Sequence, residues 1–220
     1  RLGRGAQTEV EERLRAARTN VLHALSHGAR QVVVVTSAGP REGASTTAAG
    51  LARVLALSGH RVVLVGGDLR SPSAVGAPGA PGLAEVLVGT ARLSQVLVEG
   101  EVPGLELLPA GDMPGNPSEL LGGRNMSDLL HHLAADRIVI IDAPPVCRFT
   151  DAVVLAEYAG GVLLVARAGR TSAEELREAA LAVGQGGGHM LGVVLTNVSD
   201  LGRGSRSAQT AVTHAESATV

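Results

Sequence analysis

The sequence predicts an α/β fold, a doubly wound and mostly parallel sheet with helices on both faces. Short runs of β-branched and aliphatic residues alternate with helix-like stretches along the chain. These runs are almost continuously apolar, as strands are when helices cover both faces of a parallel sheet. The repeating strand and helix order favours parallel neighbours that are joined by crossover connections.

The individual elements follow from apolar runs, helical spacing and the turn residues between them. Loops rich in proline and glycine at 71–81 and 111–117 separate the later elements. The strands are expected at 31–36, 61–65, 105–108, 137–141, 161–166 and 191–195. The helices are expected at 7–26, 45–58, 83–88, 117–133, 151–158 and 172–183.

The composition fits one folded domain and excludes several classes of protein. Of 220 residues, 45% are hydrophobic and 18% are charged, so a sizeable core is expected. The formal net charge of −2 offers no electrostatic basis for non-specific nucleic-acid binding. The single cysteine, Cys147, excludes an internal disulfide framework and fits a reducing cytoplasm. No apolar run has the length of a membrane span, but the chain starts at Arg1 rather than Met, so we expect an excerpt that leaves room for a membrane-spanning part upstream.

The strongest local signal is the stretch TSAGPREGAST at 36–46, which follows the first expected strand and opens a helix. Backbone N–H groups in such a turn point at an anion, and small residues let a phosphate come close. Ala38, Gly43 and Ser45 match the phosphate-loop pattern [AG]-x-x-x-x-G-K-[ST], whose last residue ligates Mg²⁺. Ala44 stands where the pattern has its lysine, so an ordinary glycine-rich turn is the alternative interpretation.

Two further strand ends carry acidic residues. The second strand runs into Gly66, Gly67 and Asp68, and the strand at 137–141 ends in Asp142 followed by two prolines. An acid at the carboxyl end of a strand beside a phosphate loop holds the Mg²⁺ shell in nucleotide-binding domains. An aspartate at a strand end is also a common turn former or helix cap, which is the structural alternative.

Several other segments accompany the loop and the acids: GLAEVL at 82–87, LPAG at 108–111, NPSELL at 116–121, IDAPPV at 141–146, TDA at 150–152 and RAGRT at 167–171. With these segments the chain resembles the cytoplasmic kinase domain of the bacterial tyrosine autokinases (BY-kinases) attached to polysaccharide co-polymerases. The resemblance covers roughly 11–198 and implies a P-loop NTPase fold of the Min/Par-like type. Together the segments are much more specific than a phosphate-loop match alone.

The resemblance implies a site for ATP or ADP with Mg²⁺. It implies that Ser45, Asp68 and Asp142 hold the metal and that Asp68 is the acid left from a degenerate catalytic set. Asn197 falls near the family's adenine-contacting region, although a turn-forming asparagine is an equal alternative. The residues implied for nucleotide binding are Gly39, Pro40, Arg41, Glu42, Gly43, Ala44, Ser45, Thr46 and Asn197.

The expected first helix carries Glu12, Arg15 and Arg18 in the spacing E-x-x-R-x-x-R. This pattern resembles the ring-assembly motif of the family. At this spacing the three side chains share one face of a helix. A stripe of salt bridges within the helix is the alternative interpretation.

Three features depart from the family pattern. Ala44 replaces the phosphate-loop lysine, and Gly66 replaces the first acid of the family's D-x-D motif. The tail at 200–220 contains no tyrosine, whereas the family usually carries a tyrosine-rich tail as its autophosphorylation substrate. Loss of one preorganised donor to a transition state costs about 10²–10³ in rate. We therefore expect a weak or inactive kinase, a pseudokinase.

The expected organisation has three parts: an N-terminal helix with the assembly motif at 1–30, a P-loop nucleotide-binding domain at 31–199, and a disordered tail at 200–220. The resemblance implies a cytoplasmic location at the inner face of the plasma membrane. It implies a membrane-embedded polysaccharide co-polymerase segment, fused or separate, as partner, and a homo-oligomeric ring. No nucleic-acid partner is expected.

The expected function is a kinase-like regulator of chain length and export in capsular or exopolysaccharide biosynthesis. One alternative is an active tyrosine autokinase with an altered phosphate loop. A second is a partitioning ATPase of the Min/Par type, although such proteins carry a second lysine early in the loop and 38–42 has none. A third is an interaction module that assembles through the Glu12, Arg15 and Arg18 stripe without nucleotide.

Overall fold

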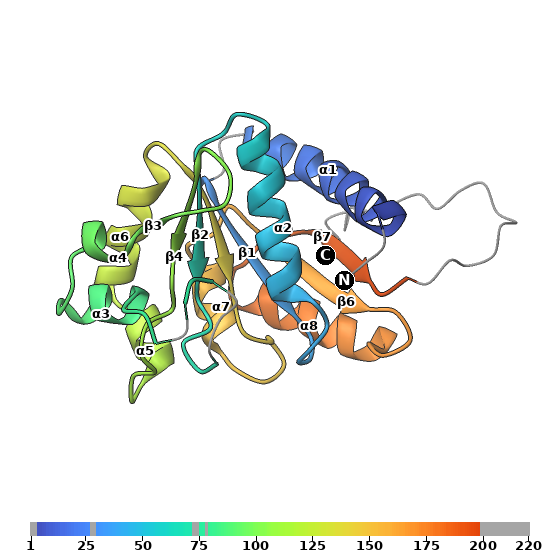
Figure 1. The fold of residues 1–220 in the computed structure, drawn as a ribbon. Coiled ribbons are helices and arrows are strands. Elements are labelled where there is room, and N and C mark those ends of the chain that lie inside the picture. The colour runs from blue at the N-terminus through green and yellow to red at the C-terminus, as the bar shows by residue number, and fades with distance from the viewer. Residues whose placement is uncertain (1–3, 27–29, 72–74, 78, 199–220) are drawn as a thin grey trace, which may run out of the picture.

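The strands of the computed structural model form one seven-stranded sheet with the order β3-β4-β2-β5-β1-β6-β7 (Figure 1). The structure describes residues 4–26, 30–71, 75–77 and 79–198. Neighbouring strands are parallel except for β3, which pairs antiparallel with β4 at one edge. The strands are β1 (Val32–Ser37), β2 (Val62–Gly66), β3 (Val98–Glu99), β4 (Leu105–Leu108), β5 (Ile138–Asp142), β6 (Gly161–Arg167) and β7 (Met190–Thr196).

Helices cover the two faces of this sheet and divide the core into two apolar clusters (Figure 1). One face is covered by α1 (Arg4–Ser26) and α2 (Ala44–Leu57). These helices pack on the side chains that the central strands present to this face. The helices that contribute to the other cluster are α3 (Leu83–Val88), α4 (Leu93–Val96), α5 (Pro117–Leu121), α6 (Arg124–Ala134), α7 (Asp151–Ala156) and α8 (Ala173–Gln185). β1, β2 and β5 are buried along their whole length, which explains why the sequence shows continuous apolar runs there.

The predicted doubly wound α/β fold is confirmed. Every strand expected from the sequence is present, and its ends differ by at most one residue from those expected. The first helix begins at Arg4 instead of residue 7, while the helix at 83–88 has the expected bounds. Among the described residues no helix has both the length and the apolar character needed to cross a bilayer.

The single helix expected at 117–133 is wrong, because the chain forms two helices there. α5 ends at Leu121 and α6 begins at Arg124, with Gly122 and Gly123 between them. The N–H of Gly122 donates to the carbonyl of Ser118 at 2.9 Å, which closes the last turn of α5 before the chain changes direction. Two consecutive glycines lower the cost of leaving the helix at this point.

The short elements α4 and β3 were not expected. β3 has two residues, both exposed, and it pairs with β4 through Val98 and Leu107 and through Glu99 and Glu106. A strand of this length has no alternating or continuous apolar pattern, so its position depends on the neighbouring strand rather than on its own sequence.

The first helix rests closely on the second. A Cβ at Gly50 of α2 would lie 2.6 Å from Cδ1 of Leu14, so the absence of a side chain at this position lets α1 approach. Further along α1, Val21 and Leu25 are buried against the same face of the sheet. α1 is therefore part of the folded domain and shares its core.

Candidate nucleotide site

The turn at 38–43 joins the end of β1 to the first residue of α2, Ala44. Gly43 caps the helix with φ 101°, a left-handed conformation that glycine adopts without strain. As a glycine, this N-cap residue has no side chain to accept hydrogen bonds from the N–H groups of the first turn of α2. These donors have no partner within a helix, so the turn offers a cradle for an anion at the positive end of the helix dipole.

Hydrogen bonds from two other strands hold the turn in shape. The hydroxyl of Thr196, at the end of β7, donates to the carbonyl of Glu42 at 2.6 Å and contacts the carbonyl of Ala166 at 3.3 Å. Nη1 of Arg167 donates to the carbonyl of Arg41 at 3.2 Å. Ser37 Oγ donates to the carbonyl of Gly39 at 2.8 Å within the turn itself. The carbonyls therefore face the protein, which leaves the amide side of the turn for a ligand.

Two adjacent charged residues of the turn lie in opposite environments. Glu42 is 4% exposed, and its Oε1 lies 3.1 Å from the position of a Cβ at Gly39. Its Oε2 is buried and makes no hydrogen bond within the part of the chain that the structure describes. Arg41 is exposed and has φ 61°, which is unusual for a residue with a side chain. Glu42 thus offers a ligand only its backbone, whereas the guanidinium of Arg41 is accessible.

The remaining loop residues implied for nucleotide binding are in one place. Gly39, Pro40, Ala44 and Ser45 are half-buried and Thr46 is exposed, all at the junction of the turn with α2. Asn197 is exposed, has φ 54° and follows Thr196, the residue that anchors the turn. Asn197 therefore lies next to the residue that contacts the loop, and its predicted part in nucleotide binding stays a prediction.

Asp142 ends β5 between the strands that lead to the loop and to Asp68. It pairs in register with Gly66 of β2 and with Val35 of β1, and its side chain is 2% exposed. The N–H of Gly67 donates to the carbonyl of Asp142 at 2.8 Å. The carboxyl ends of β1, β2 and β5 thus meet where the sequence predicts a metal site.

Asp68 follows β2 in a turn beside this point. Its Oδ1 accepts a hydrogen bond from the N–H of Arg70 at 3.1 Å. Burial disfavours the charged form and raises the pKa of Asp68, against the opposite influence of hydrogen bonds from the backbone of Arg70 and Ser71. A bound cation would oppose this shift, because it favours the charged carboxylate.

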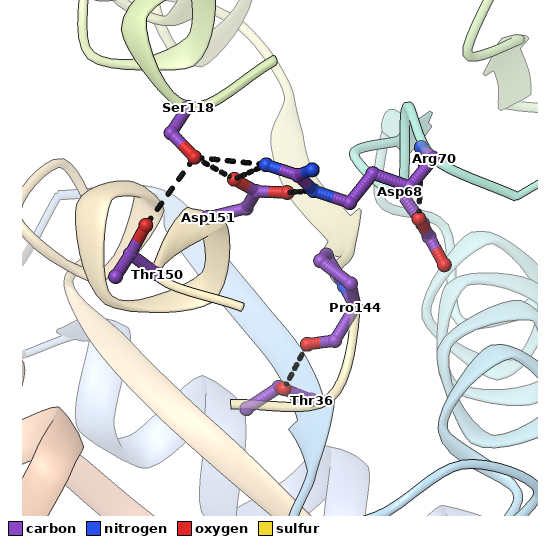
Figure 2. Close-up of polar contacts among 7 residues, drawn as sticks. All are labelled: Thr36, Asp68, Arg70, Ser118, Pro144, Thr150 and Asp151. Carbon is purple, nitrogen blue, oxygen red and sulfur yellow. Dashed lines mark hydrogen bonds and ion pairs between the residues drawn. The ribbon is translucent and has the colours of Figure 1, made fainter. Parts of the chain in front are cut away.

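The strand before the loop, β1, is connected to the turn after β5. Thr36 Oγ1 donates to the carbonyl of Pro144 at 2.7 Å in a buried contact (Figure 2). The N–H of Ala143 donates to the carbonyl of Val35 at 2.9 Å, and that of Val146 donates to the carbonyl of Ser37 at 2.8 Å. These contacts fix the segment after Asp142 relative to the phosphate loop.

The residues present fit magnesium only together with a nucleotide. In the described ranges no group of three His, Cys, Asp or Glu side chains is close enough to hold a metal. Mg²⁺ in nucleotide sites is usually held by one or two carboxylates, with phosphate oxygens and water completing its shell. Ser45, Asp68 and Asp142 are the residues that the sequence predicts for the protein part of such a set.

A group of residues that the sequence did not single out lies beside Asp68 (Figure 2). Arg70 extends from the same turn to the carboxylate of Asp151 and to Ser118. The segments NPSELL and TDA contain Ser118 and Asp151, so the resemblance included them without a role. Their contact depends on the tertiary structure, because the three residues are far apart in sequence.

The residues of the expected assembly motif lie on α1 and are not part of this site. Arg15 Nη1 pairs with Glu12 Oε2 at 2.9 Å within the helix, and both side chains are exposed. This pair is the contact that the alternative interpretation of the motif predicts. Arg18 is half-buried on the same helix.

Cys147, in the segment after Asp142, is exposed and close to acidic residues. Partial burial, and then the carboxylates of Glu178, Glu175 and Glu42, raise the pKa of its thiol. The thiolate is the reactive form of cysteine, so this environment disfavours a nucleophile.

Comparison with known proteins identifies the family. No family model matches the chain. The chain is 36% identical over 188 residues to the tyrosine-protein kinase YwqD of Bacillus subtilis. The aligned residues cover 84% of this chain and 79% of YwqD. It is 39% identical over 171 residues to the putative tyrosine-protein kinase EpsB of Ralstonia nicotianae, over 76% of this chain. It spans only 23% of the length of EpsB and 26% of that of the tyrosine-protein kinase ptk of Acinetobacter johnsonii.

Solved structures agree with this result. The kinase domain of the tyrosine kinase ETK of Escherichia coli superposes with a TM-score of 0.82 at 30% identity, over 90% of this chain and 80% of that one. The cell division ATPase MinD of Pyrococcus furiosus superposes with a TM-score of 0.63 at 21% identity, over 77% and 73%. The second likeness shows the shared P-loop NTPase fold alone. From its identity to YwqD over most of both proteins, the chain belongs to the bacterial tyrosine-kinase (BY-kinase) family of P-loop NTPases.

Proposed function

We propose that this chain is a nucleotide-responsive, kinase-like domain of capsular or exopolysaccharide biosynthesis in which phosphotransfer is weak or lost. The proposal is supported by the turn at 38–43 before α2 and by the register pair of Gly66 and Asp142, where Ala44 and Gly66 replace two charged residues of the family pattern. On this proposal the backbone donors of the loop still bind a nucleotide, while two charges that act in the transition state are missing.

Nucleotide binding is supported by the uncapped first turn of α2, and by the hydrogen bonds from Thr196 and Arg167 that hold the loop. Backbone donors of the loop would hold the phosphates, and Ser45, Asp68 and Asp142 would hold Mg²⁺. When bound, the metal would neutralise phosphate charge. The residues proposed for nucleotide contact are Gly39, Pro40, Arg41, Gly43, Ala44, Ser45, Thr46 and Asn197, with Glu42 contributing through its backbone.

Weak phosphotransfer follows from the two replacements. A hydrogen bond to a charged group contributes about 1.5–3 kcal/mol, and the methyl group of Ala44 makes none. Removing one preorganised donor lowers the rate by about 10²–10³. Because Gly66 replaces the first acid of the D-x-D motif, Asp68 is the acid that remains in the turn after β2. The attacking hydroxyl therefore loses a second group that would position it. The two losses act on one site and are not expected to be additive.

The proposed setting follows from the family. The relatives that are much longer than this chain contain other regions, and we propose that a membrane-embedded polysaccharide co-polymerase segment, fused or separate, is the partner. The domain would then work in the cytoplasm at the inner face of the plasma membrane, as a regulator of chain length and export. A homo-oligomeric ring through Glu12, Arg15 and Arg18 is part of this proposal.

Calorimetric titration with ADP and ATP, each with Mg²⁺ and with EDTA, tests the nucleotide site. A parallel assay measures phosphate transfer from ATP to tyrosine peptides. We expect binding that Mg²⁺ strengthens, together with little or no phosphotransfer. Robust Mg²⁺-dependent tyrosine phosphorylation would contradict the loss of catalysis, and absence of binding to both nucleotides would contradict the nucleotide site.

Assembly is tested separately by measuring the molar mass in solution with and without Mg-ADP. Arg18→Ala and Arg15→Ala are expected to lower the mass of an assembled form without changing nucleotide affinity. Arg13→Ala, on the same helix but outside the motif, is the matched control. A monomer under all conditions would leave the Glu12 and Arg15 pair as a contact within one helix.

A further inference from the structure

Arg70 connects three segments at the carboxyl edge of the sheet (Figure 2). Its Nε donates to Oδ2 of Asp151 at 2.6 Å, and its Nη2 donates to Oδ1 of the same carboxylate at 3.1 Å. Nη2 also donates to Ser118 Oγ at 3.0 Å. The guanidinium lies over the ring of Phe149 with 4.7 Å between Cζ and the ring centroid. The edge of the planar group formed by Nε and Nη2 is therefore fixed by the carboxylate, as in other bidentate arginine pairs.

The partner of Arg70 is completely buried. The side chain of Asp151 is 0% exposed, while that of Arg70 is 30% exposed. Ser118 Oγ donates to Oδ1 of Asp151 and lies 3.2 Å from Thr150 Oγ1 (Figure 2). Asp151 thus receives hydrogen bonds from two different segments, and its carboxylate cannot turn independently of them.

The backbone of Arg70 orients Asp68. The N–H of Arg70 donates to Asp68 Oδ1 at 3.1 Å, so the residue whose side chain is held by Asp151 also holds the candidate metal ligand. The other end of this turn is fixed by the hydrogen bond of 2.8 Å from the N–H of Gly67 to the carbonyl of Asp142. Asp68 lies between these two attachments.

A buried ion pair is an inefficient way to stabilise a fold. Replacing such a pair with apolar residues of similar size is often neutral or stabilising, whereas removing one partner is strongly destabilising. The pair of Arg70 and Asp151 is accordingly explained better by the orientation it imposes than by stability. Groups that orient a metal ligand typically change metal affinity by about 10- to 100-fold when they are mutated.

We infer that Arg70 is a positioning residue that, anchored on buried Asp151, holds Asp68 in the orientation needed for the Mg²⁺ of a bound nucleotide. The inference rests on the proposed nucleotide site. It assigns to the contacts between the β2 turn, α5 and α7 a role in Mg²⁺-dependent binding. Since Gly66 supplies no carboxylate, the orientation of Asp68 matters more here than in a turn with two acids.

The test uses the gain in ADP affinity that Mg²⁺ produces, measured by calorimetry as the ratio of affinities with Mg²⁺ and with EDTA. The double variant Arg70→Met, Asp151→Leu removes both charges, and the single variants leave one charge without its partner. Thermal unfolding is measured for each. We expect the single variants to unfold at lower temperature and the double variant to recover most of this loss.

In the double variant the gain from Mg²⁺ is expected to fall by about 10- to 100-fold while affinity in EDTA is unchanged. In an Asp68→Asn background the same double variant is expected to change the gain no further, because Arg70 acts through Asp68. Arg70→Lys keeps the positive charge but loses the two parallel donors of the guanidinium. This variant is expected to remain stable and to show a smaller gain in ADP affinity from Mg²⁺. Arg61→Met, which breaks the exposed ion pair with Asp136 at the opposite edge of the sheet, is the control and should leave the gain unchanged.

A gain from Mg²⁺ that survives in the double variant and in Arg70→Lys would overturn the inference and leave the proposed site intact. A further loss on top of Asp68→Asn would also overturn it, because Arg70 would then act by another route. If the wild-type protein binds no ADP in Mg²⁺ or in EDTA, both the proposed nucleotide site and the positioning role are wrong.

Discussion

A side chain at Gly66 has no room, because a Cβ at this position would lie 2.8 Å from the backbone nitrogen of Ala110. Ala110 follows β4, the strand that pairs with β2, so the close approach belongs to the sheet edge and not to a flexible side chain. Gly66 also pairs in register with Asp142. The space that the side chain of the family's first acid would need at position 66 is therefore taken by the backbone of Ala110.

Restoring that acid is expected to destabilise the protein. Gly66→Asp requires β2 and the segment at Ala110 to move apart, and overpacking of this kind costs about 1–3 kcal/mol. Urea unfolding measures the difference. Gly115→Asp is the matched control, since among the described residues beyond its two chain neighbours no heavy atom lies within 4 Å of a Cβ at Gly115. Equal stability of Gly66→Asp and wild type would show that Ala110 moves without cost.

Restoring the lysine is expected to succeed. Ala44 is half-buried at the start of α2, beside the loop. Ala44→Lys adds a charged hydrogen bond of about 1.5–3 kcal/mol to the phosphates, which corresponds to about 10- to 100-fold in ADP affinity. Calorimetry measures it, with Ala44→Met as a control for side-chain length. Unchanged affinity in Ala44→Lys would place the phosphates elsewhere. Tyrosine phosphorylation is not expected to return, because Gly66 remains.

The hydroxyl of Thr196 is expected to stabilise both the loop and the fold. Thr196→Val removes a donor to the carbonyls of Glu42 and Ala166 while it keeps the shape of the side chain. Leaving a buried acceptor unpaired costs about 1–3 kcal/mol. Chemical denaturation checks the stability, and ADP titration checks the loop. Thr196→Ser keeps the hydroxyl and should resemble the wild type in both, and a loss of equal size in the serine variant would attribute the effect to packing.

The pKa of Asp68 makes stability depend on pH in a specific direction. Burial raises this pKa in the folded state, so the folded protein binds the proton more tightly than the unfolded chain. The resulting stability is present below the ordinary aspartate pKa and is lost as pH rises through the raised value. In buffer without Mg²⁺, Asp68→Asn should therefore gain stability relative to wild type as pH increases through this window.

Urea unfolding between about pH 3 and pH 7 measures this difference. Asp112→Asn, at an exposed aspartate that follows β4, is the matched control for the loss of a carboxylate. A difference between wild type and Asp68→Asn that is constant over the window, or that changes in the opposite direction, would show that Asp68 has no raised pKa.

The sequence alone predicts the sheet because β1, β2 and β5 are buried on both faces and must be continuously apolar. It also places the phosphate loop and Asp142, since a turn after one parallel strand and an acid after another meet at the same edge. It misses β3 and the break at Gly122, where a neighbouring strand or a pair of glycines decides the local structure. The expected tail at 200–220 lies outside the described residues. The division of the chain into parts at 1–30, 31–199 and 200–220 stays a prediction.

What the sequence by itself determined is the family, the fold and the two replacements at Ala44 and Gly66, because each depends on residue identity at a known distance from a strand. What only the tertiary structure decided is how the rest of the molecule is arranged around these positions. Ala110 occupies the space beside Gly66, Glu42 is buried, and Arg70 reaches Asp151. These contacts join residues that are distant in the chain, and close packing and paired charges set them only after the sheet has formed.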